Sequence, residues 1–223
     1  MQRKKISLIL LAGGVGSRME ASLPKQFLIL GDKPVVRHSL DVFLGIPQIT
    51  EVIVVCLPEY RGIFDSCKNI RFAEPGNRRQ DSVYNGFLKT DPSNEIICIH
   101  DAARPFINNE IVLSTLKAGE EWGAATVGMP ITFTIKKGTA DNFVESTPDR
   151  NFIWEIQTPQ VLHRTILAEG FAYAQKNDIT VSDDVSLAEL INKKVKLVEG
   201  SHMNFKLTTP KDLAIANVLL QQR

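Results

Sequence analysis

The first 130 residues alternate short apolar runs with longer amphipathic stretches. The apolar runs are rich in isoleucine and valine and end at turn residues, which is typical of buried strands. This pattern predicts strands at Ile6 to Leu11, Glu51 to Cys56, Ile70 to Ala73, Glu95 to His100 and Ala124 to Met129. The intervening stretches predict helices at Val36 to Leu44, Glu59 to Cys67, Gln80 to Lys89 and Asn109 to Trp122. Such alternation favours an α/β fold with a mostly parallel sheet flanked by helices.

The pattern changes after residue 130. Thr132 to Lys136 alternates apolar and polar side chains with a period of two, which is typical of a half-exposed strand. Turn residues follow at Lys137-Gly138 and Asp141-Asn142, and a return strand is expected from Phe143. We therefore predict an antiparallel arm over about residues 131–157. A hairpin that cannot bury its own apolar face often packs against a partner subunit.

The remaining residues return to the earlier rhythm. They predict helices at Arg164 to Lys176, Asp183 to Asn192 and Pro210 to Leu220, and a strand at Val195 to Val198. Thr209 is suited to cap the last helix, since Pro210 fits its first turn. No internal repeat or low-complexity linker interrupts the chain, so we expect a single domain over residues 1–223 that carries the arm as an insertion.

Composition removes several classes of protein. The chain has 26 basic and 25 acidic residues, a net charge of +1, whereas a duplex DNA-binding protein carries a strong basic excess. No apolar run approaches the roughly 18 residues that span a membrane, and the apolar stretch after Lys5 is shorter than that of a signal peptide. Three cysteines without a paired motif favour free thiols. We therefore expect a cytoplasmic protein with neither a nucleic acid nor a membrane as partner.

The loop after the first predicted strand is the first candidate site. It reads Leu-Ala-Gly-Gly-Val-Gly-Ser-Arg-Met over residues 11–19 and would lie at the carboxyl end of the sheet, where α/β proteins bind ligands. Glycines let backbone N–H groups approach a phosphate, and Arg18 and Lys25 add positive charge. Met19 stands where a dinucleotide-binding fingerprint needs its third glycine, and no Walker A motif occurs. The alternative is a glycine turn with two surface cations.

Two further loops carry candidate chemistry. Gly76 to Ser82 precedes or opens a helix, whose exposed N–H groups favour anions or base edges; the alternative is a solvated basic turn. Asp101 ends a buried strand and is suited to bind a hydroxyl group or Mg²⁺; the alternative is a structural pair with Arg104. Small side chains at Ala102 and Ala103 would allow close approach of a ligand, whereas we assign no role to the neighbouring His100.

Later polar residues are uninformative when taken one at a time. Asp183 and Asp184 precede a predicted helix and could simply cap it. The others could be surface groups, and they are Thr134, Asp149-Arg150, Gln157-Thr158-Pro159-Gln160, Ser182 and Lys206.

Taken together, these motifs resemble the 2-C-methyl-D-erythritol 4-phosphate cytidylyltransferase family over roughly Ile6 to Ala216. The segments 11–14, 18–19 and 24–26 are shared by many sugar-nucleotide transferases. The segments 100–105, 149–151 and 158–160, with Trp154, are specific to this family. The resemblance implies a Rossmann-like nucleotidyltransferase fold and a transfer of the cytidylyl group from CTP to 2-C-methyl-D-erythritol 4-phosphate. The phosphate oxygen of the acceptor would attack the α-phosphorus in line, with pyrophosphate as the leaving group.

The resemblance also assigns residues. It implies catalytic cations at Arg18 and Lys25, and a CTP-binding set at Ala12, Gly13, Gly14, Gly16, Gly76, Arg79, Ser82, Asp101 and Ala102. Asp101 would also serve Mg²⁺ or another divalent cation. The implied acceptor-binding set is Arg104, Thr134, Arg150, Ser182 and Lys206. The arm would form a homodimer in which Arg150 serves the neighbouring site.

Two residues depart from the family pattern. Phe133 stands where an aspartate is expected, and Ser182 stands where threonine is more usual, although the hydroxyl is kept. Other functions remain open, namely a ribitol-5-phosphate cytidylyltransferase, a transferase of another nucleotide to a sugar phosphate, and a non-catalytic nucleotide-binding regulator. The absent third glycine disfavours an NAD-dependent dehydrogenase.

Overall fold

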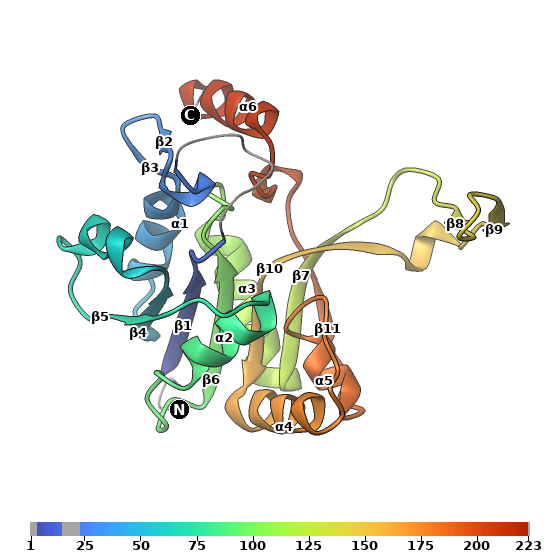
Figure 1. Ribbon diagram of the computed structural model, residues 1–223, viewed down its shortest axis with the longest axis horizontal. Coiled ribbons are helices and arrows are strands. Elements are labelled where there is room, and N and C mark those ends of the chain that lie inside the picture. Colours follow the sequence, from blue (N-terminus) through green and yellow to red (C-terminus); the bar gives the residue numbers. More distant parts are fainter. Residues whose placement is uncertain (1–3, 15–22, 223) are drawn as a thin grey trace.

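The computed structural model describes residues 4–14 and 23–222. Its centre is a seven-stranded sheet in the order β11-β7-β10-β6-β1-β4-β5, shown in Figure 1. The strands are β1 (Ile6–Leu11), β4 (Ile49–Val55), β5 (Ile70–Ala73), β6 (Ile96–Asp101), β7 (Ala124–Pro130), β10 (Trp154–His163) and β11 (Lys196–Glu199). Strands β5, β4, β1 and β6 run parallel to one another, and β11 runs parallel to β7. The predicted mostly parallel α/β sheet is therefore confirmed.

Strand β10 is the element that the sequence pattern missed. It runs antiparallel to both of its neighbours, with Gln160 opposite Ile99 of β6 and opposite Thr126 of β7. Gln157, Thr158 and Gln160 are almost fully buried despite their polarity. A polar run interrupted by a proline does not read as a central strand. Its place is determined by the hydrogen bonds that these side chains find in the folded protein, which a local pattern cannot reveal.

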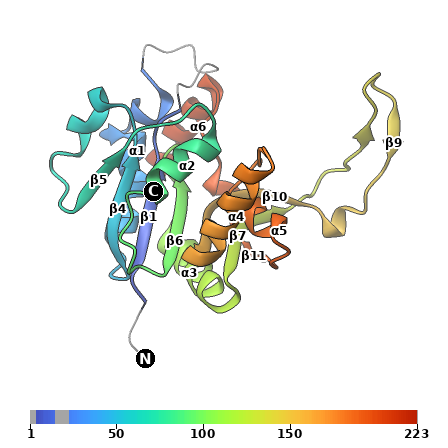
Figure 2. The ribbon, with the colours of Figure 1, turned by 60° about the horizontal axis from the view of Figure 1, so that its bottom comes forward.

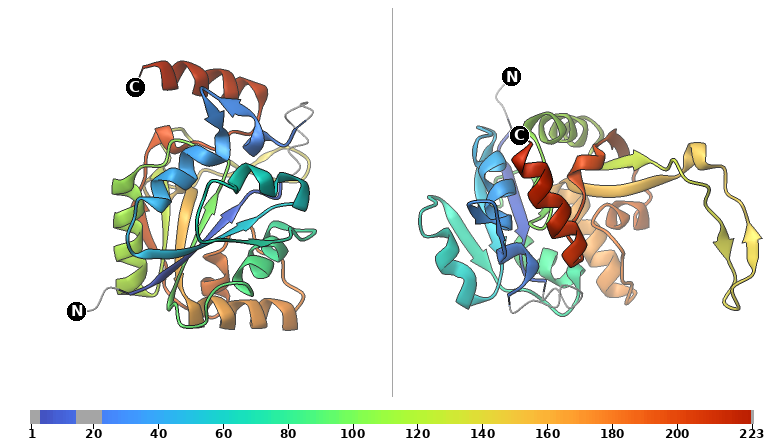
Figure 3. Two further views of the ribbon diagram at one scale, coloured as in Figure 1. Left: turned by 90° about the vertical axis from the view of Figure 1, so that its left-hand side faces the viewer. Right: turned by 90° about the horizontal axis from the view of Figure 1, so that it is seen from above.

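Helices cover both faces of the sheet (Figure 3). Helices α1 (Val35–Leu44) and α3 (Asn109–Trp122) pack on one face. Helices α2 (Arg79–Phe87), α4 (Arg164–Lys176) and α5 (Ser186–Leu190) pack on the other. Helix α6 (Pro210–Gln221) lies over the hairpin of β2 (Ile29–Leu30) and β3 (Lys33–Pro34), with a smaller cluster around Leu30, Phe106 and Leu207. Thr209 caps α6 as predicted, and its side chain accepts a hydrogen bond from the Asp212 N–H.

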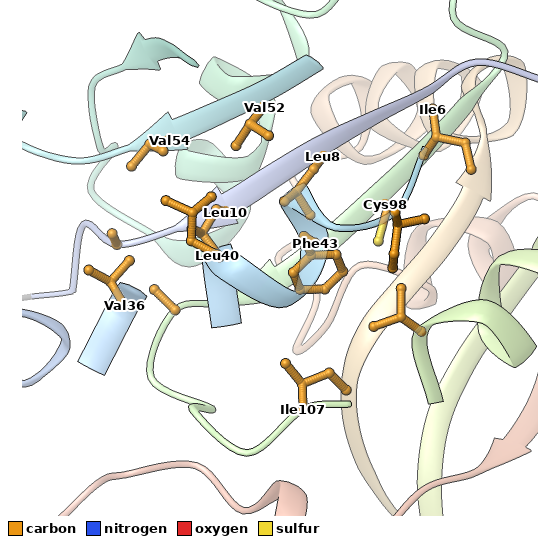
Figure 4. Packing of buried hydrophobic residues seen from close by; sticks show 14 of the residues in the cluster. Ile6, Leu8, Leu10, Val36, Leu40, Phe43, Val52, Val54, Cys98 and Ile107 are labelled. Carbon is orange, nitrogen blue, oxygen red and sulfur yellow. The ribbon is translucent and has the colours of Figure 1, made fainter. Parts of the chain in front are cut away.

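The alternation of side chains along β1 explains why both faces are apolar. Leu8 and Leu10 point toward α1, where they meet Leu40 and Phe43, and Figure 4 shows this packing. Ile9 points to the opposite face and belongs to the second cluster. A parallel strand covered on both sides needs apolar residues at successive positions, which accounts for the continuous run from Leu8 to Leu11.

Residues 131–153 leave the body of the protein as an extended arm (Figures 1 and 2). Its base is the pairing of β7 with the start of β10, and its tip is the small hairpin of β8 (Lys137–Gly138) and β9 (Val144–Ser146). The predicted strand over residues 132–136 is wrong, because that stretch is extended without a paired neighbour in the described structure. Lys137-Gly138 forms a strand rather than a turn, whereas the turn at Asp141-Asn142 is confirmed.

Two predicted helices differ in detail. Residues 59–67 form a 3₁₀ helix, η3 (Pro58–Phe64), rather than an α-helix. The helix expected from Asp183 begins later, at Ser186, because residues 182–184 bend toward the polar groups described below. Among the described residues, further 3₁₀ turns are η2 (Lys25–Phe27), η4 (Arg150–Phe152) and η5 (His202–Asn204).

Candidate active site

A cleft of about 340 Å³ lies at the carboxyl ends of β1 and β6. The loop after β1 forms one wall, with Gly13 and Gly14, and η2 contributes Lys25 and Gln26. The segment around Gly76 to Ser82 forms the opposite wall, and Asp101, Ala103 and Lys206 close one end. Three loops that the sequence singled out therefore meet in one cavity, as expected for ligand binding at the carboxyl edge of an α/β sheet.

Gln26 holds the glycine loop in shape. Its buried side-chain amide donates to the carbonyl oxygen of Ala12, at 2.6 Å, and to that of Gly14, at 2.9 Å. These bonds fix the backbone of the loop, and Gln26 itself lines the cleft beside it. A Cβ atom on Gly14 would meet nothing within 4 Å, so the loop presents bare backbone to the cavity. Such a surface can approach a phosphate closely.

Close packing explains the glycines on the two walls. A Cβ atom on Gly13 would lie 2.5 Å from Cβ of Pro75, and one on Gly76 would lie 2.4 Å from Cβ of Asp81. Ser82, in the first turn of α2, accepts a hydrogen bond from the Gly76 N–H at 3.0 Å. Ser82 therefore orders the turn that lines the cleft. A side chain at Gly13 would force the loop after β1 away from Pro75, and one at Gly76 would disturb the start of α2.

Asp101 is the centre of charge in the site. Its carboxylate lies 2.9 Å from Nζ of Lys206, 3.4 Å from Nη2 of Arg79 and 3.5 Å from Nε of Arg104. Burial acts to raise the pKa of Asp101, but the three cations outweigh it and hold the pKa well below its ordinary value. Asp101 is therefore ionised. The three cations outnumber the two carboxylates that pair with them, since Arg79 also pairs with Asp184.

A second cavity of about 320 Å³ adjoins the cleft. Arg79, Asp101 and Lys206 line both, so these three side chains form a wall between them. On the far side of this wall the second cavity is lined by Arg104 and by polar residues of β10 and of the loop before α5, including Ser182. The arrangement provides two compartments for two ligands, with positive charge at the boundary.

The polar side chains of β10 hold this wall together. Thr158 Oγ1 accepts a hydrogen bond from the Asp101 N–H at 3.1 Å and lies 3.0 Å from Nδ1 of His100. Asn204 donates to Gln157 Oε1 and to the Thr158 carbonyl. The Arg104 guanidinium donates to the Asn204 carbonyl at 2.8 Å, which ties the segment before Lys206 to the end of β6.

His100 is structural rather than catalytic, in line with its lack of an assigned role. It is fully buried, its ring lies 4.9 Å from that of Phe43, and burial lowers its pKa to about 3. The imidazole is therefore neutral at physiological pH. Within the described residues its Nε2 has no hydrogen-bonding partner, so packing and the contact with Thr158 hold the ring in place.

Several predicted residues lie away from the cavities. Ala12 and Ala102 are buried beneath the cleft rather than on its surface. Thr134 and Arg150 are on the exposed arm, where Arg150 donates to the Thr132 carbonyl, and neither lines a described cavity. Phe133, the departure from the family pattern, is 80% exposed on the same arm. Gly16 and Arg18 lie outside the described residues.

Sequence reasoning gave no role to three residues that shape the site. Gln26 supports the glycine loop, Asn204 links two strands, and Asp184 pairs with Arg79 through two bonds of 2.7 and 2.8 Å. Asp184 resembles a helix cap in the sequence, but it is the Asp183 carboxylate that accepts a hydrogen bond from the Ser186 N–H at the start of α5. The position of Gln26 beside Lys25 was the one available signal, whereas nothing near Asp184 in sequence pointed to Arg79.

The described residues contain no ready-made metal cage. Within 4–14 and 23–222, no three or more His, Cys, Asp or Glu side chains gather to hold a metal ion. Asp101 is the acidic residue that lines the cleft. In addition, no helix in this part of the chain is both long and apolar enough to cross a lipid bilayer.

Comparison with known proteins agrees with the geometry. Residues 6–222 match the family model of 2-C-methyl-D-erythritol 4-phosphate cytidylyltransferase. The enzyme of that name from Chlamydia pneumoniae is 43% identical over 97% of this chain and 99% of its own length. The chloroplastic enzyme from Oryza sativa is 42% identical, over 100% of this chain and 77% of its own length.

Solved structures share the fold over nearly the whole chain. The 4-diphosphocytidyl-2C-methyl-D-erythritol synthase from Anaerococcus prevotii matches 98% of this chain and 96% of its own, with a TM-score of 0.88 and 30% identity. The 2-C-methyl-D-erythritol 4-phosphate cytidylyltransferase from Thermus thermophilus matches 97% of this chain and 99% of its own, with a TM-score of 0.81 and 29% identity. The chain belongs to the 2-C-methyl-D-erythritol 4-phosphate cytidylyltransferase family.

Proposed function

We propose that this protein transfers the cytidylyl group from CTP to 2-C-methyl-D-erythritol 4-phosphate, giving 4-diphosphocytidyl-2-C-methyl-D-erythritol and pyrophosphate. The family supplies the substrates. The observation that carries the proposal is the pair of adjoining cavities with Arg79, Asp101 and Lys206 in their common wall. CTP occupies the glycine-lined cleft and the acceptor occupies the second cavity, so that the reacting phosphates meet at the positively charged boundary.

Charge and position account for the chemistry. The acceptor phosphate is already ionised at neutral pH, so the site needs no general base to activate it. The transition state spreads negative charge over the α-phosphate, and cations placed beside it lower the barrier. Lys25 lines the cleft next to the glycine loop and is the described residue placed for this role. Arg104 and Lys206 face the second cavity and are placed to bind the acceptor phosphate.

A divalent cation fits this donor set only together with the nucleotide. Mg²⁺ is commonly held by one or two carboxylates plus substrate phosphates, and Asp101 is the carboxylate in the cleft. We propose that Asp101 takes this part, with Mg²⁺ or another divalent cation. When bound, the cation offsets charge on the triphosphate. Asp101 must then exchange one of its present cationic partners for the metal.

The arm supports a homodimer. Among the described residues it exposes Phe133, Phe143, Val144 and Phe152, with exposed fractions of 62% to 80%. Four large apolar side chains on one thin projection are unfavourable in water and indicate a protein partner. We propose that a second copy covers them, and that Thr134 and Arg150 reach the acceptor cavity of that copy, since neither lines a described cavity of its own chain.

The activity is tested by pyrophosphate release with CTP and Mg²⁺, offering 2-C-methyl-D-erythritol 4-phosphate and D-ribitol 5-phosphate in separate reactions. We expect turnover with the first acceptor alone. Turnover with ribitol 5-phosphate alone would overturn the proposed identity of the acceptor. CTP binding without turnover would favour a non-catalytic nucleotide-binding regulator. Lys25→Ala should lower kcat by about 10²–10³, the usual loss of one electrostatic stabiliser. Lys117→Ala, on the exposed face of α3, is the matched control.

The shared site is tested by mixing two inactive variants. If Arg150 serves the partner, a dimer of Lys25→Ala with Arg150→Ala has one intact site and one doubly damaged site. Random exchange of subunits should then restore about a quarter of wild-type activity, because half of the dimers are mixed and each has one working site. No recovery, with mixed dimers verified by differential tags, would place Arg150 in the site of its own chain.

We also propose a cytoplasmic location. The three cysteines, Cys56, Cys67 and Cys98, are free thiols, and two of them are buried, which is typical of proteins in a reducing compartment. Fractionation of the source cells followed by the pyrophosphate assay tests this location.

A further inference from the structure

Arg79 is held by two carboxylates that belong to different parts of the fold. It is the first residue of α2, and its guanidinium makes two parallel bonds to Asp184, Nη1 to Oδ1 at 2.7 Å and Nη2 to Oδ2 at 2.8 Å. The same Nη2 lies 3.4 Å from Asp101. Two-point pairing fixes the plane of a guanidinium, whereas the longer contact does not. Asp184 therefore determines where Arg79 lies.

Asp184 is itself immobilised. Its side chain is 3% exposed, and its backbone N–H donates to Oε1 of Gln160 at 2.7 Å. Gln160 is buried in β10 and also donates to Thr126 Oγ1 and to Asp183 Oδ2. Burial raises the pKa of Asp184, while the Arg79 guanidinium acts in the opposite direction. Because the Asp183 carboxylate accepts the hydrogen bond from the Ser186 N–H, the start of α5 does not require a carboxylate at position 184.

Without this partner, Arg79 would turn to Asp101. Asp184 and Asp101 are the acids within ion-pair distance of Arg79 in the described structure, and Asp101 already pairs with Lys206 and Arg104. A guanidinium released from Asp184 would compete with those cations and occupy the carboxylate that faces both cavities. It would also leave its place in the wall.

We propose that Asp184 is a positioning residue for cytidylyl transfer, which holds Arg79 in the wall between the two cavities and keeps it from closing onto Asp101. The inference rests on the proposed function for its kinetic consequences, but its geometric part concerns CTP binding alone. Removing an outer partner that orients a ligand-binding group typically costs 10- to 100-fold in affinity or activity. We expect Asp184→Asn to weaken CTP binding about tenfold and to lower kcat/KM for CTP by about 10–100-fold.

The conservative variant separates charge from packing. Asp184→Glu keeps the carboxylate, so it should retain CTP affinity to within about threefold of wild type. If Asp184→Asn does not fold, the Asp184→Glu variant still tests the proposal. A loss of tenfold or more in Asp184→Glu, with an unchanged melting temperature, would overturn the proposal. Ser186→Ala is the matched control, because it removes the hydroxyl that donates to Asp183 in the same turn but contacts neither Arg79 nor a cavity.

The deciding measurement is a double-mutant cycle by calorimetric titration of CTP. Lysine at position 79 cannot form the two-point pair, so the effect of Asp184→Asn should fall from about tenfold to less than threefold in the Arg79→Lys background. Equal effects in both backgrounds, or a similar loss in Ser186→Ala, would show that position 184 acts only through folding. Absence of turnover by wild type would refute the proposed function, while the CTP titrations would still decide the role of Asp184.

Discussion

Replacing Gln26 with glutamate tests whether the glycine loop depends on the hydrogen bonds that the Gln26 side chain donates to it. The two residues have nearly the same shape, but the carboxylate has no N–H to donate. Gln26→Glu therefore removes both hydrogen bonds, to the carbonyl oxygens of Ala12 and Gly14, and places negative charge against those oxygens. Gln26 is 3% exposed, so solvent cannot relieve this arrangement unless the loop moves.

The magnitude follows from those two bonds. A buried acceptor that loses its donor costs about 1–3 kcal/mol, so two acceptors, one of them only partly buried, give a total of about 2–4 kcal/mol. The protein can meet this cost by lower stability or by movement of the loop away from Gln26. Movement of the loop disturbs the wall of the CTP cleft, and each 1.4 kcal/mol lost there raises the dissociation constant tenfold.

Urea unfolding and CTP titration should therefore be measured on the same variant. We expect the loss in unfolding free energy and the loss in CTP binding free energy to add up to about 2–4 kcal/mol. Gln175→Glu makes the same chemical change on the exposed surface of α4 and should alter neither quantity by more than about 0.5 kcal/mol. If Gln26→Glu matches that control in both assays, the loop does not depend on Gln26 and the reasoning is wrong.

Three further predictions concern stability. His100 is neutral in the folded state because burial lowers its pKa to about 3, whereas in the unfolded state it binds a proton below about pH 6.5. The folded protein therefore loses stability as the pH falls through this value. Between pH 8 and pH 5, the unfolding free energy of wild type should fall by about 2 kcal/mol more than that of His100→Gln, measured by urea unfolding. Gly119→Ala would place a Cβ atom 2.3 Å from Cγ1 of Val161, so α3 must shift from β10 and thermal unfolding should show a loss of about 1–3 kcal/mol. Thr209→Ala removes the cap of α6 and should cost about 1 kcal/mol in the same assay.

The parallel half of the sheet could be predicted because its strands are recognisable from their local sequence. Ile6–Leu11 and Ile70–Ala73 agree with the predicted bounds, and the apolar runs of β4 and β6 differ from theirs by one or two residues. Strands β1 and β6 are buried on both faces, so apolar residues are required at successive positions. The helix at Asn109–Trp122 was likewise predictable from its apolar stripe and from the glycine that ends it.

The arm and β10 could not be predicted in the same way. The two-residue alternation at 132–136 indicates a strand. In the described structure, however, no neighbouring strand lies beside this segment, so it does not form part of a sheet. In β10 the polar residues are buried because they meet partners 23 to 58 residues away, such as Asp183 for Gln160 and His100 for Thr158. Local propensity contains no information about those partners.

The candidate site likewise has a part that could be predicted from the sequence and a part that could not. Loops at the carboxyl ends of β1 and β6 were predictable because topology alone places them together, and Lys25, Arg79 and Asp101 do meet there. The side chains that orient these groups were not predictable, since Asp184 lies 105 residues from Arg79 and approaches it only after β10 has joined the sheet. Residues that contact a ligand belong to motifs, whereas residues that position them depend on the completed fold.

Strand β10 is where the arm and the site become one structure. Its first residue, Trp154, pairs with Pro130 at the base of the arm, and four positions later Thr158 holds the backbone of Asp101. Gln160, two residues further, holds the backbone of Asp184 and thereby the partner of Arg79. Strand β10 pairs with β7 at residues 154–156 and again at residues 160–162, where it also pairs with β6, so it is anchored on either side of an irregularity between Ile156 and Gln160. The second copy proposed to pack on the arm would therefore contact residues that lead directly into the strand supporting the wall between the two cavities, which would link dimer formation to the placement of Arg79 and Asp101.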